Sequence, residues 1–272
     1  MIPQFFDIHG HLNDVQFDQD RDVVLERMKM RSVGGVVVGT DEKTSREVVE
    51  MAEKSPEQIY AAIGIHPIDN RNEKFHESVF AELAQSPRVI AVGECGLDYS
   101  RPAEVSDVSL EKKRQRALFE EQIDFAIAHN LPLMLHIRDC DKARADAHRD
   151  VLAILTEKKK TAGEALRGDV HFFAQTLEIA REYFALGFTI SFTGVITFSR
   201  EYDEVIREAP LESIMSETDC PYVAPVPYRG KRNEPIYVEE VVKKIAEIRG
   251  EDFETVRAQL VANVIRTFNL KV

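Results

Sequence analysis

Short apolar runs alternate with longer amphipathic stretches along the whole chain. Several of the short runs, such as residues 35–39, are apolar at successive positions, which is typical of parallel strands buried on both faces. The longer stretches place apolar residues at helical spacing, most clearly in residues 110–129, where Leu118, Phe125 and Ala126 fall on one face. The alternation predicts repeated βαβ units and a parallel sheet.

The pattern contains eight candidate strands and nine candidate helices. The strands are expected at residues 5–8, 35–39, 59–65, 89–93, 132–136, 169–172, 189–192 and 213–216. The helices are expected at residues 20–31, 44–53, 74–84, 110–129, 144–159, 176–185 and 200–208, with two more, 237–249 and 253–268, after the last strand. No linker rich in Ser, Gly or Pro interrupts the series, which predicts one domain over residues 1–272. An open doubly wound sheet shows the same alternation.

The position of the titratable residues separates these two folds. In an α/β barrel, functional side chains gather at the carboxyl ends of the strands. Ligand-type residues stand at such ends repeatedly along this sequence: His9, His11, His66, Glu94, His136, His171 and Asp219. The arrangement favours an α/β fold of the (β/α)8 TIM type with an extra C-terminal helix.

The same residues predict a metal site. Residues two apart on a strand point to the same side, so His9 and His11 can face the barrel mouth and hold one ion. Imidazoles with carboxylates suit Zn, Mn or Fe, and carboxylate-rich variants accept Mg. Without His66, six candidate ligands remain, which exceeds the three protein ligands of one catalytic ion and predicts two divalent ions. Glu94 is the expected bridge because it comes from a central strand.

Composition limits the class of partner. A net charge of −12 argues against a broad basic surface for duplex DNA. It leaves a nuclease open, because bound divalent cations supply positive charge where a phosphate reacts. No apolar run approaches the roughly 20 residues of a membrane span, and the first residues do not resemble a signal peptide. We therefore expect a cytoplasmic protein with no membrane contact and no obligate protein partner.

Two cysteines and the remaining histidines are expected to be structural or to lie at the surface, while Cys140, near the end of the fifth strand, stays a reserve candidate. Cys95 and Cys220 directly follow ligand candidates, so their thiols should point toward the helices. His76, His129 and His148 fall on helical patterns or helix ends, where a solvated surface position is expected.

Seven segments carry a resemblance to a known family. They are Asp-Ile-His-Gly-His-Leu at 7–12, Gly-Ile-His-Pro at 64–67, Gly-Glu-Cys-Gly-Leu-Asp-Tyr at 93–99, Leu-His-Ile-Arg at 135–138, Ser-Phe-Thr-Gly at 191–194, Glu-Thr-Asp-Cys-Pro-Tyr at 217–222 and Arg-Gly-Lys-Arg-Asn-Glu-Pro at 229–235. With these motifs, the sequence resembles the TatD family of metal-dependent deoxyribonucleases, within the amidohydrolase-like barrels. The resemblance covers nearly the whole chain.

The resemblance implies a division of the ligands between two ions. His9, His11, Glu94 and Asp219 would hold one ion, and Glu94, His136 and His171 would hold the other. It also implies a nucleic-acid substrate, namely single-stranded DNA or DNA ends, cleaved by a metal-activated water.

Other residues receive expected roles in that reaction. Asp219 is the expected general base, and His66 would protonate or orient the leaving oxygen. Arg138 would pair with phosphate or order the metal shell, and Tyr99 and Tyr222 would contact a base or pack in the core. Arg229 and Asn233, in the proline-rich loop after the eighth strand, would bind substrate or order the loop.

The sequence departs from the family pattern after the sixth strand. The family usually reads His-x-Phe-Ser/Thr-Gly, whereas here Ala174 and Gln175 follow His171-Phe172-Phe173. Glycine adopts conformations that glutamine does not, so the loop should differ in shape and Gln175 could enter the substrate cleft. Residues 101–108 also form a longer segment that could cap the site.

Two alternative functions stay open at this point. The same metal-water chemistry serves hydrolysis of an amide, a lactone or an aminoacyl ester, including that of aminoacyl-tRNA. Barrel amidohydrolases often use a carboxylated lysine as the bridge, and Glu94 in that place favours the nuclease. A non-catalytic barrel would have lost ligands, and this sequence has lost none.

Overall fold

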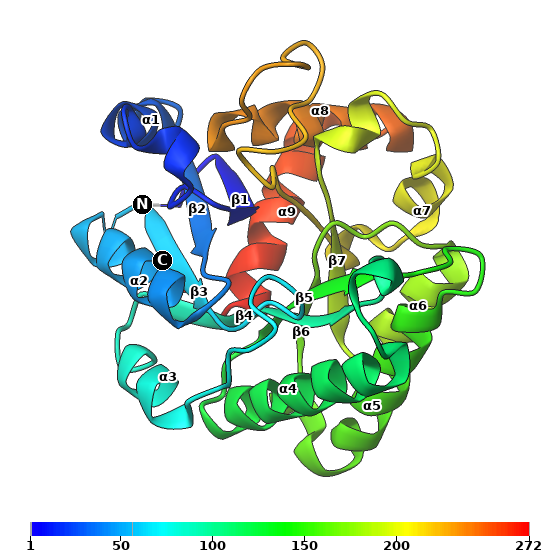
Figure 1. Cartoon of the computed structure of the whole chain (residues 1–272). Coiled ribbons are helices and arrows are strands. Elements are labelled where there is room, and N and C mark those ends of the chain that lie inside the picture. Colours follow the sequence, from blue (N-terminus) through cyan, green and yellow to red (C-terminus); the bar gives the residue numbers. More distant parts are fainter. Residues whose placement is uncertain (1, 56, 272) are drawn as a thin grey trace.

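The computed structural model describes residues 2–55 and 57–271. Within them, eight parallel strands follow one another around the sheet in sequence order, and each overlaps a predicted strand. They are β1 (Phe5–Gly10), β2 (Val33–Val38), β3 (Ile59–Ile63), β4 (Val89–Asp98), β5 (Leu133–Arg138), β6 (Gly168–Val170), β7 (Phe188–Phe192) and β8 (Ile214–Ser216) (Figure 1). The predicted barrel is confirmed, because a doubly wound sheet reverses its strand order at a switch point.

The helices lie outside the strands and match the predicted series. They are α1 (Arg21–Met30), α2 (Glu42–Lys54), α3 (Glu77–Leu83), α4 (Val108–Ala128), α5 (Asp146–Ala162), α6 (Leu177–Ala185), α7 (Asp203–Glu208), α8 (Val238–Arg249) and α9 (Phe253–Thr267). Local sequence sets several of their starts: Asp41 and Thr44 form a reciprocal capping box at α2, and Asp107 caps α4. In the part of the chain described, no helix is long and apolar enough to cross a membrane.

Helix α9 packs against both β1 and β8, the first and last strands of the barrel. Between these two strands the described residues form one isolated bridge, between Gly10 at the end of β1 and Cys220, four residues beyond β8. The buried Asn263 amide of α9 donates to the carbonyl oxygens of Leu211 and Ile214 at 2.8 Å each. The predicted extra helix is therefore present, and it is packed against the seam between these two strands and against the interior of the barrel.

An apolar plug fills the barrel interior. It contains alternate residues of β1, Phe6 and Ile8, together with residues of β2 to β5 and β8, with Val264 of α9 and with Phe268 directly after that helix. These side chains are almost fully buried, so the polar residues at the carboxyl ends of the strands lie above an apolar layer that excludes water. Cys95 and Cys220 belong to the separate cluster between sheet and helices, as predicted.

The prediction of a surface position is wrong for His148. The side chain is buried beneath α5, with Nδ1 3.1 Å from the hydroxyl of Tyr183. Burial lowers the pKa of His148 to about 3, and the Asp139 carboxylate, 3.9 Å from Nε2, is too distant for a hydrogen bond that would offset it. The imidazole is therefore neutral in the folded protein.

This burial predicts a pH-dependent contribution to stability. A histidine with a depressed folded pKa stabilises the fold fully above its unfolded pKa of about 6.5 and loses that contribution as the pH falls toward the folded value. We expect the stability difference between the wild type and His148→Gln to shrink by about 2 kcal/mol from pH 7 to pH 5. Urea unfolding of both proteins at each pH measures it. His129→Gln, at an exposed position, is the control, and an unchanged difference for His148→Gln would contradict the prediction.

Candidate metal centre

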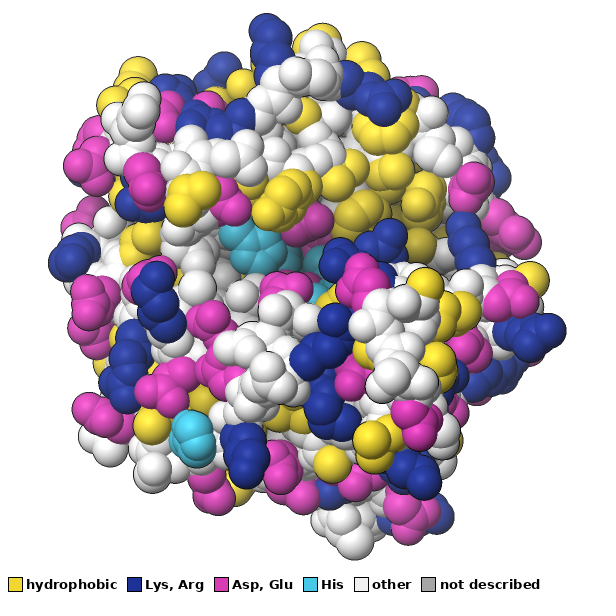
Figure 2. Space-filling view, viewed as in Figure 1, with side chains coloured by type: hydrophobic (Ala, Val, Ile, Leu, Met, Phe, Trp, Pro, Cys, Tyr) yellow, Lys and Arg dark blue, Asp and Glu magenta, His cyan; other side chains and the backbone are white. Residues whose placement is uncertain are grey.

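The carboxyl ends of the strands surround an open cavity of about 750 Å³. Its lining includes His11, His66, Glu94, Asp98, Arg138, His136, His171 and Asp219. Figure 2, viewed from this side, shows histidine side chains at the bottom of a hollow near the centre of the face. The structure thus gathers most of the predicted metal ligands, with His66 and Arg138, in one accessible place.

An irregularity in β1 aims the first histidine into the barrel. Side chains on a regular strand alternate, so His9 would point away from the interior that Ile8 faces. The register between β1 and β2 shifts between Asp7 and Gly10, and this turns His9 inward as well. His11 follows one residue beyond the strand, and its Nε2 lies 3.2 Å from Nε2 of His9.

The close contact of β4 with β5 sets the position of Glu94. At Gly96, which has φ +144°, a Cβ would lie 2.1 Å from the carbonyl oxygen of His136. Only glycine permits that approach. The pairing places Glu94 and Asp98, four residues apart, on either side of the His136 ring.

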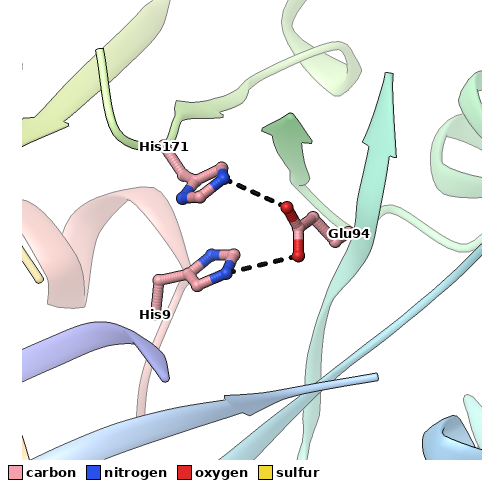
Figure 3. A group of neighbouring side chains, drawn as sticks. All are labelled: His9, Glu94 and His171. Carbon is pink, nitrogen blue, oxygen red and sulfur yellow. Dashed lines mark ion pairs between the residues drawn. The ribbon is translucent and has the colours of Figure 1, made fainter. Parts of the chain in front are cut away.

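One oxygen of Glu94 faces the first group of donors. Oε2 lies 3.4 Å from Nε2 of His9 (Figure 3). The same oxygen lies 3.7 Å from Nε2 of His11. Oδ1 of Asp219 lies 4.0 and 3.6 Å from the same two nitrogens. Two imidazole nitrogens and two carboxylate oxygens therefore converge on one point.

The other oxygen of Glu94 faces a second group. Oε1 lies 2.7 Å from Nδ1 of His136 and 3.1 Å from Nε2 of His171, and these two nitrogens are 3.4 Å apart. The rings of His9 and His171 stack with centroids 3.8 Å apart, so the two groups of donors lie directly beside each other (Figure 3).

His66 stands beside the second group with its other nitrogen well supported. Its Nε2 lies 3.7 Å from Oε1 of Glu94. On the far side of the ring, Oδ1 of Asp69 lies 3.0 Å from Nδ1, and the amides of Ile68 and Asp69 also point at Nδ1, at 3.4 and 3.2 Å. Nδ1 therefore has a partner whether or not it carries a hydrogen, and the ring keeps its orientation when its protonation changes.

Buried carboxylates behind the histidines were missed by the sequence reasoning. Oδ2 of Asp98 lies 3.0 Å from Nε2 of His136. Oε1 of Glu217 lies 3.5 Å from Nδ1 of His171 and accepts the Phe172 amide at 2.7 Å. Carboxylates commonly fix the tautomer and orientation of metal-binding histidines in this way.

Asp7 orders the seam rather than a histidine ring. It accepts hydrogen bonds from the backbone amides of His9 and Thr218 and from the Thr218 hydroxyl. The sequence did contain a signal for these supporting carboxylates. Asp7 stands two residues before the ligand candidate His9, and Glu217 stands two residues before the ligand candidate Asp219.

Electrostatics in the cluster favour bound positive charge. Burial opposes ionisation of Glu94, yet the imidazoles of His171 and His9 outweigh it and hold its pKa well below the usual range. Burial likewise disfavours a charged His11, but the hydrogen bond that it donates to Asp219 and the charge of Glu94 raise the pKa of His11 to about 9. The buried carboxylates and imidazoles of the cluster therefore stabilise one another only when positive charge lies among them.

The donor set passes a simple chemical test for a metal ion. The Nε2 atoms of His9 and His11 lie 3.2 Å apart, where a proton on one ring can be shared with the other, and a metal ion bound by both nitrogens would supply the positive charge in place of that proton. Nδ1 of His9, although buried, has no hydrogen-bond partner among the described residues. Within the same part of the chain, three groups could hold an ion: His9, Glu94 and His171; His9, His11 and Asp219; and His66, Glu94 and His136.

Several predicted substrate residues lie away from the cavity. Tyr99 is buried, and its hydroxyl donates to Asp150 at 2.8 Å, which favours its packing role over base contact. Asn233 is fully buried and donates to the carbonyl oxygens of Thr218 and Tyr222, which favours loop ordering. Arg229 is exposed and stacks over the Phe198 ring at 3.7 Å, outside the cavity lining.

Gln175 does not enter the cleft, contrary to the expectation. Its amide donates to Asp139 and to the carbonyl oxygen of Lys142, both at 2.8 Å, and the side chain is buried. Glutamine in this position therefore braces the loop after β5, because a buried amide requires such partners. In the segment 101–108, Arg101 lines the mouth, and Pro102 and Val105 cover a smaller side cavity.

A parallel barrel with clustered imidazoles and carboxylates at its mouth is typical of metal-dependent hydrolases, and comparison with known proteins places the chain in that class. A family model for TatD related DNases matches residues 6–269. The chain is 39% identical over 269 residues to the uncharacterized metal-dependent hydrolase YabD of Bacillus subtilis, covering 97% of this chain and 99% of that protein. It is 33% identical over 275 residues to the 3'-5' ssDNA/RNA exonuclease TatD of Erwinia billingiae, with coverage of 97% and 99%.

Structural comparison agrees. The crystal structure of YJJV, a TatD homolog from Escherichia coli K12, matches with a TM-score of 0.87 and 27% identity over 100% of both chains. The chain belongs to the TatD family, and the predicted resemblance is confirmed.

The carboxylate behind His136 gives a testable prediction. Asp98→Asn keeps the size of the side chain but removes the charge 3.0 Å from Nε2, so His136 should be held less firmly. We expect affinity for Zn²⁺ or Mn²⁺ to fall roughly 10- to 100-fold, measured by titration calorimetry. Asp150→Asn, which changes a carboxylate bonded to Tyr99 instead, is the matched control. Equal affinities for the two variants would argue against the orienting role of Asp98.

Proposed function

We propose that this chain is a divalent-metal-dependent exonuclease that hydrolyses phosphodiester bonds at the ends of single-stranded nucleic acid. The observation that carries the proposal is Glu94, whose two oxygens face two separate groups of imidazole and carboxylate donors at an open mouth. The family membership and the exonuclease named among its relatives support the same substrate class.

Two ions are assigned to the two groups. His9, His11, Glu94 and Asp219 would hold one, and Glu94, His136 and His171 the other. The mixture of nitrogen and oxygen donors suits Zn or Mn, and Mg is the third candidate. Ions bound there would lower the pKa of water toward neutrality and stabilise negative charge on the phosphoryl oxygens.

Asp219 is assigned as the general base. Its pKa lies below the usual range, because the hydrogen bond with His11 and the charge of His9 outweigh the effect of burial, so the carboxylate is ionised at neutral pH. Oδ1 faces the two histidines, while Oδ2 has no hydrogen-bond partner within the described residues. A carboxylate oxygen left available in this way can accept the proton of an attacking water.

His66 is assigned to the leaving oxygen. Its Nε2 faces the cluster, and Nδ1 is backed by Asp69 and by two amides. The ring can therefore give up the Nε2 proton without turning, which is what protonation of a leaving oxygen requires.

Arg138 is assigned to phosphate. It is exposed at the end of β5, lines the mouth and, among the described residues, has no ion pair or side-chain hydrogen bond. A guanidinium without a partner can bind a phosphate through two parallel hydrogen bonds.

An assay of purified protein tests the reaction. After chelation and addition of Zn, Mn or Mg, we expect release of mononucleotides from single-stranded DNA or RNA labelled at one end and little cleavage of a closed duplex circle. An aminoacyl ester is the competing substrate. Cleavage of the ester with both nucleic acids left intact would overturn the proposed substrate and support the carbonyl alternative.

Glu94→Gln tests the bridge. The amide keeps the shape of the side chain but lacks the negative charge that both groups share, so we expect loss of both ions and a fall in activity of more than about a hundredfold. Metal content measured by mass spectrometry and nuclease rate are the readouts. Glu47→Gln, which alters another carboxylate of the mouth, should leave both unchanged. Full metal content in Glu94→Gln would refute the bridging assignment.

A further inference from the structure

Phe172 adopts a backbone conformation that only the surrounding structure can hold. Its φ is +48°, in the left-handed region where the Cβ of an L residue crowds its own backbone. The conformation is fixed by the hydrogen bond from its amide to Glu217, the carboxylate behind His171. Strained residues of this kind cluster at functional sites.

The strain brings an aromatic ring to the mouth. Phe172 is half-buried and lines the cavity directly after His171, with the two ring centroids 6.2 Å apart. A glycine would adopt the same backbone without strain. The shape of the turn alone would favour glycine at position 172, so the presence of phenylalanine there is better explained by a use for its phenyl ring.

A second aromatic residue lines the same side of the mouth. Tyr202, immediately before α7, is half-buried and is also part of the cavity lining. The ammonium group of Lys142 lies 5.8 Å from its ring centroid and pairs with Glu201. Phe172 follows β6, Tyr202 lies in the segment between β7 and α7, and Arg138 ends β5, so all three line the cavity from consecutive units of the barrel.

Charge distinguishes this side of the mouth from the opposite one. Three carboxylates, Asp14, Glu47 and Asp69, line the cavity near β1 to β3, and Lys43, which pairs with Glu47, is the one lysine of the lining there among the described residues, so the net charge of this side is negative and disfavours a polyanion. Arg138 and the nearby Lys142 lie on the side of β5 to β7. Figure 2 shows dark blue and yellow side chains to the right of the central histidines.

We propose that Phe172 and Tyr202 form a stacking platform for the bases of single-stranded nucleic acid, with Arg138 holding the adjoining phosphate. The proposal rests on the function proposed above and names the wall along which the strand runs. Aromatic faces accept every base, and cations beside them follow the phosphates, so binding of this kind tolerates any sequence. A double helix, whose bases are already stacked, would not use the platform.

Binding measured without cleavage tests the platform. With the metal removed by chelator, fluorescence anisotropy compares a labelled oligothymidylate with an abasic strand of the same length, which has the phosphates but no bases. We expect the wild type to bind the oligothymidylate roughly tenfold or more tightly than the abasic strand. Phe172→Gly should abolish most of that difference and leave binding of the abasic strand unchanged.

Three further variants separate stacking from structural damage. Phe172→Gly also removes the backbone strain, and unfolding in urea checks that its fold is retained. Phe172→Tyr keeps an aromatic face and should bind as the wild type does, and Arg138→Gln should weaken both strands alike. Leu110→Ala, an exposed apolar position at the start of α4, is the control for loss of apolar surface.

The outcomes distinguish the platform from the reaction. A wild type that binds both strands equally, or a Phe172→Gly variant that binds oligothymidylate as tightly as the wild type, overturns the platform even if the enzyme cleaves DNA. A base preference that depends on Phe172 supports the platform even if the assay shows no nuclease activity.

Discussion

The arrangement of the mouth depends on one buried carboxylate that is shared by two groups of imidazoles. Glu94 can stay ionised in the barrel only because positive charge surrounds it, and its two oxygens face histidines from different strands. The positions of these histidines are therefore restricted by their shared contact with Glu94. Removing its charge would leave closely spaced imidazoles without a common partner.

The backbone features around Glu94 are best understood as means of placing it. The irregularity in β1 turns His9 inward, and Gly96 lets β4 approach β5 closely enough for Asp98 and Glu94 to flank His136. Beneath them, Phe6, Ile8 and the other plug residues keep the floor dry, which strengthens every electrostatic interaction above it.

The sequence was sufficient for the strands and for most of the cluster because both follow from local pattern. Buried parallel strands have a recognisable composition, and barrel topology brings their carboxyl ends together whatever lies between. His148 was misplaced because its residue type was considered without its spacing: Val151, Leu152 and Leu155 share its buried face.

Other features depend on contacts between distant segments and could not be predicted. The orientation of Gln175 depends on Asp139 and Lys142, more than thirty residues away. The carboxylates Asp98 and Glu217 are recognisable as orienting groups only once the histidine rings are placed. Sequence identifies which residues are near the mouth, whereas packing decides which way each one points.

The seam of the barrel has a consequence for synthesis of the protein. His9 lies on the first strand of the barrel, whereas Asp219 follows the eighth strand and is made more than two hundred residues later. The bridge between Gly10 and Cys220 and the bonds from Asn263 likewise join segments that are far apart in the sequence. A nascent chain that has not yet reached Asp219 would therefore lack a complete metal centre, although most of the ligand residues had already been made.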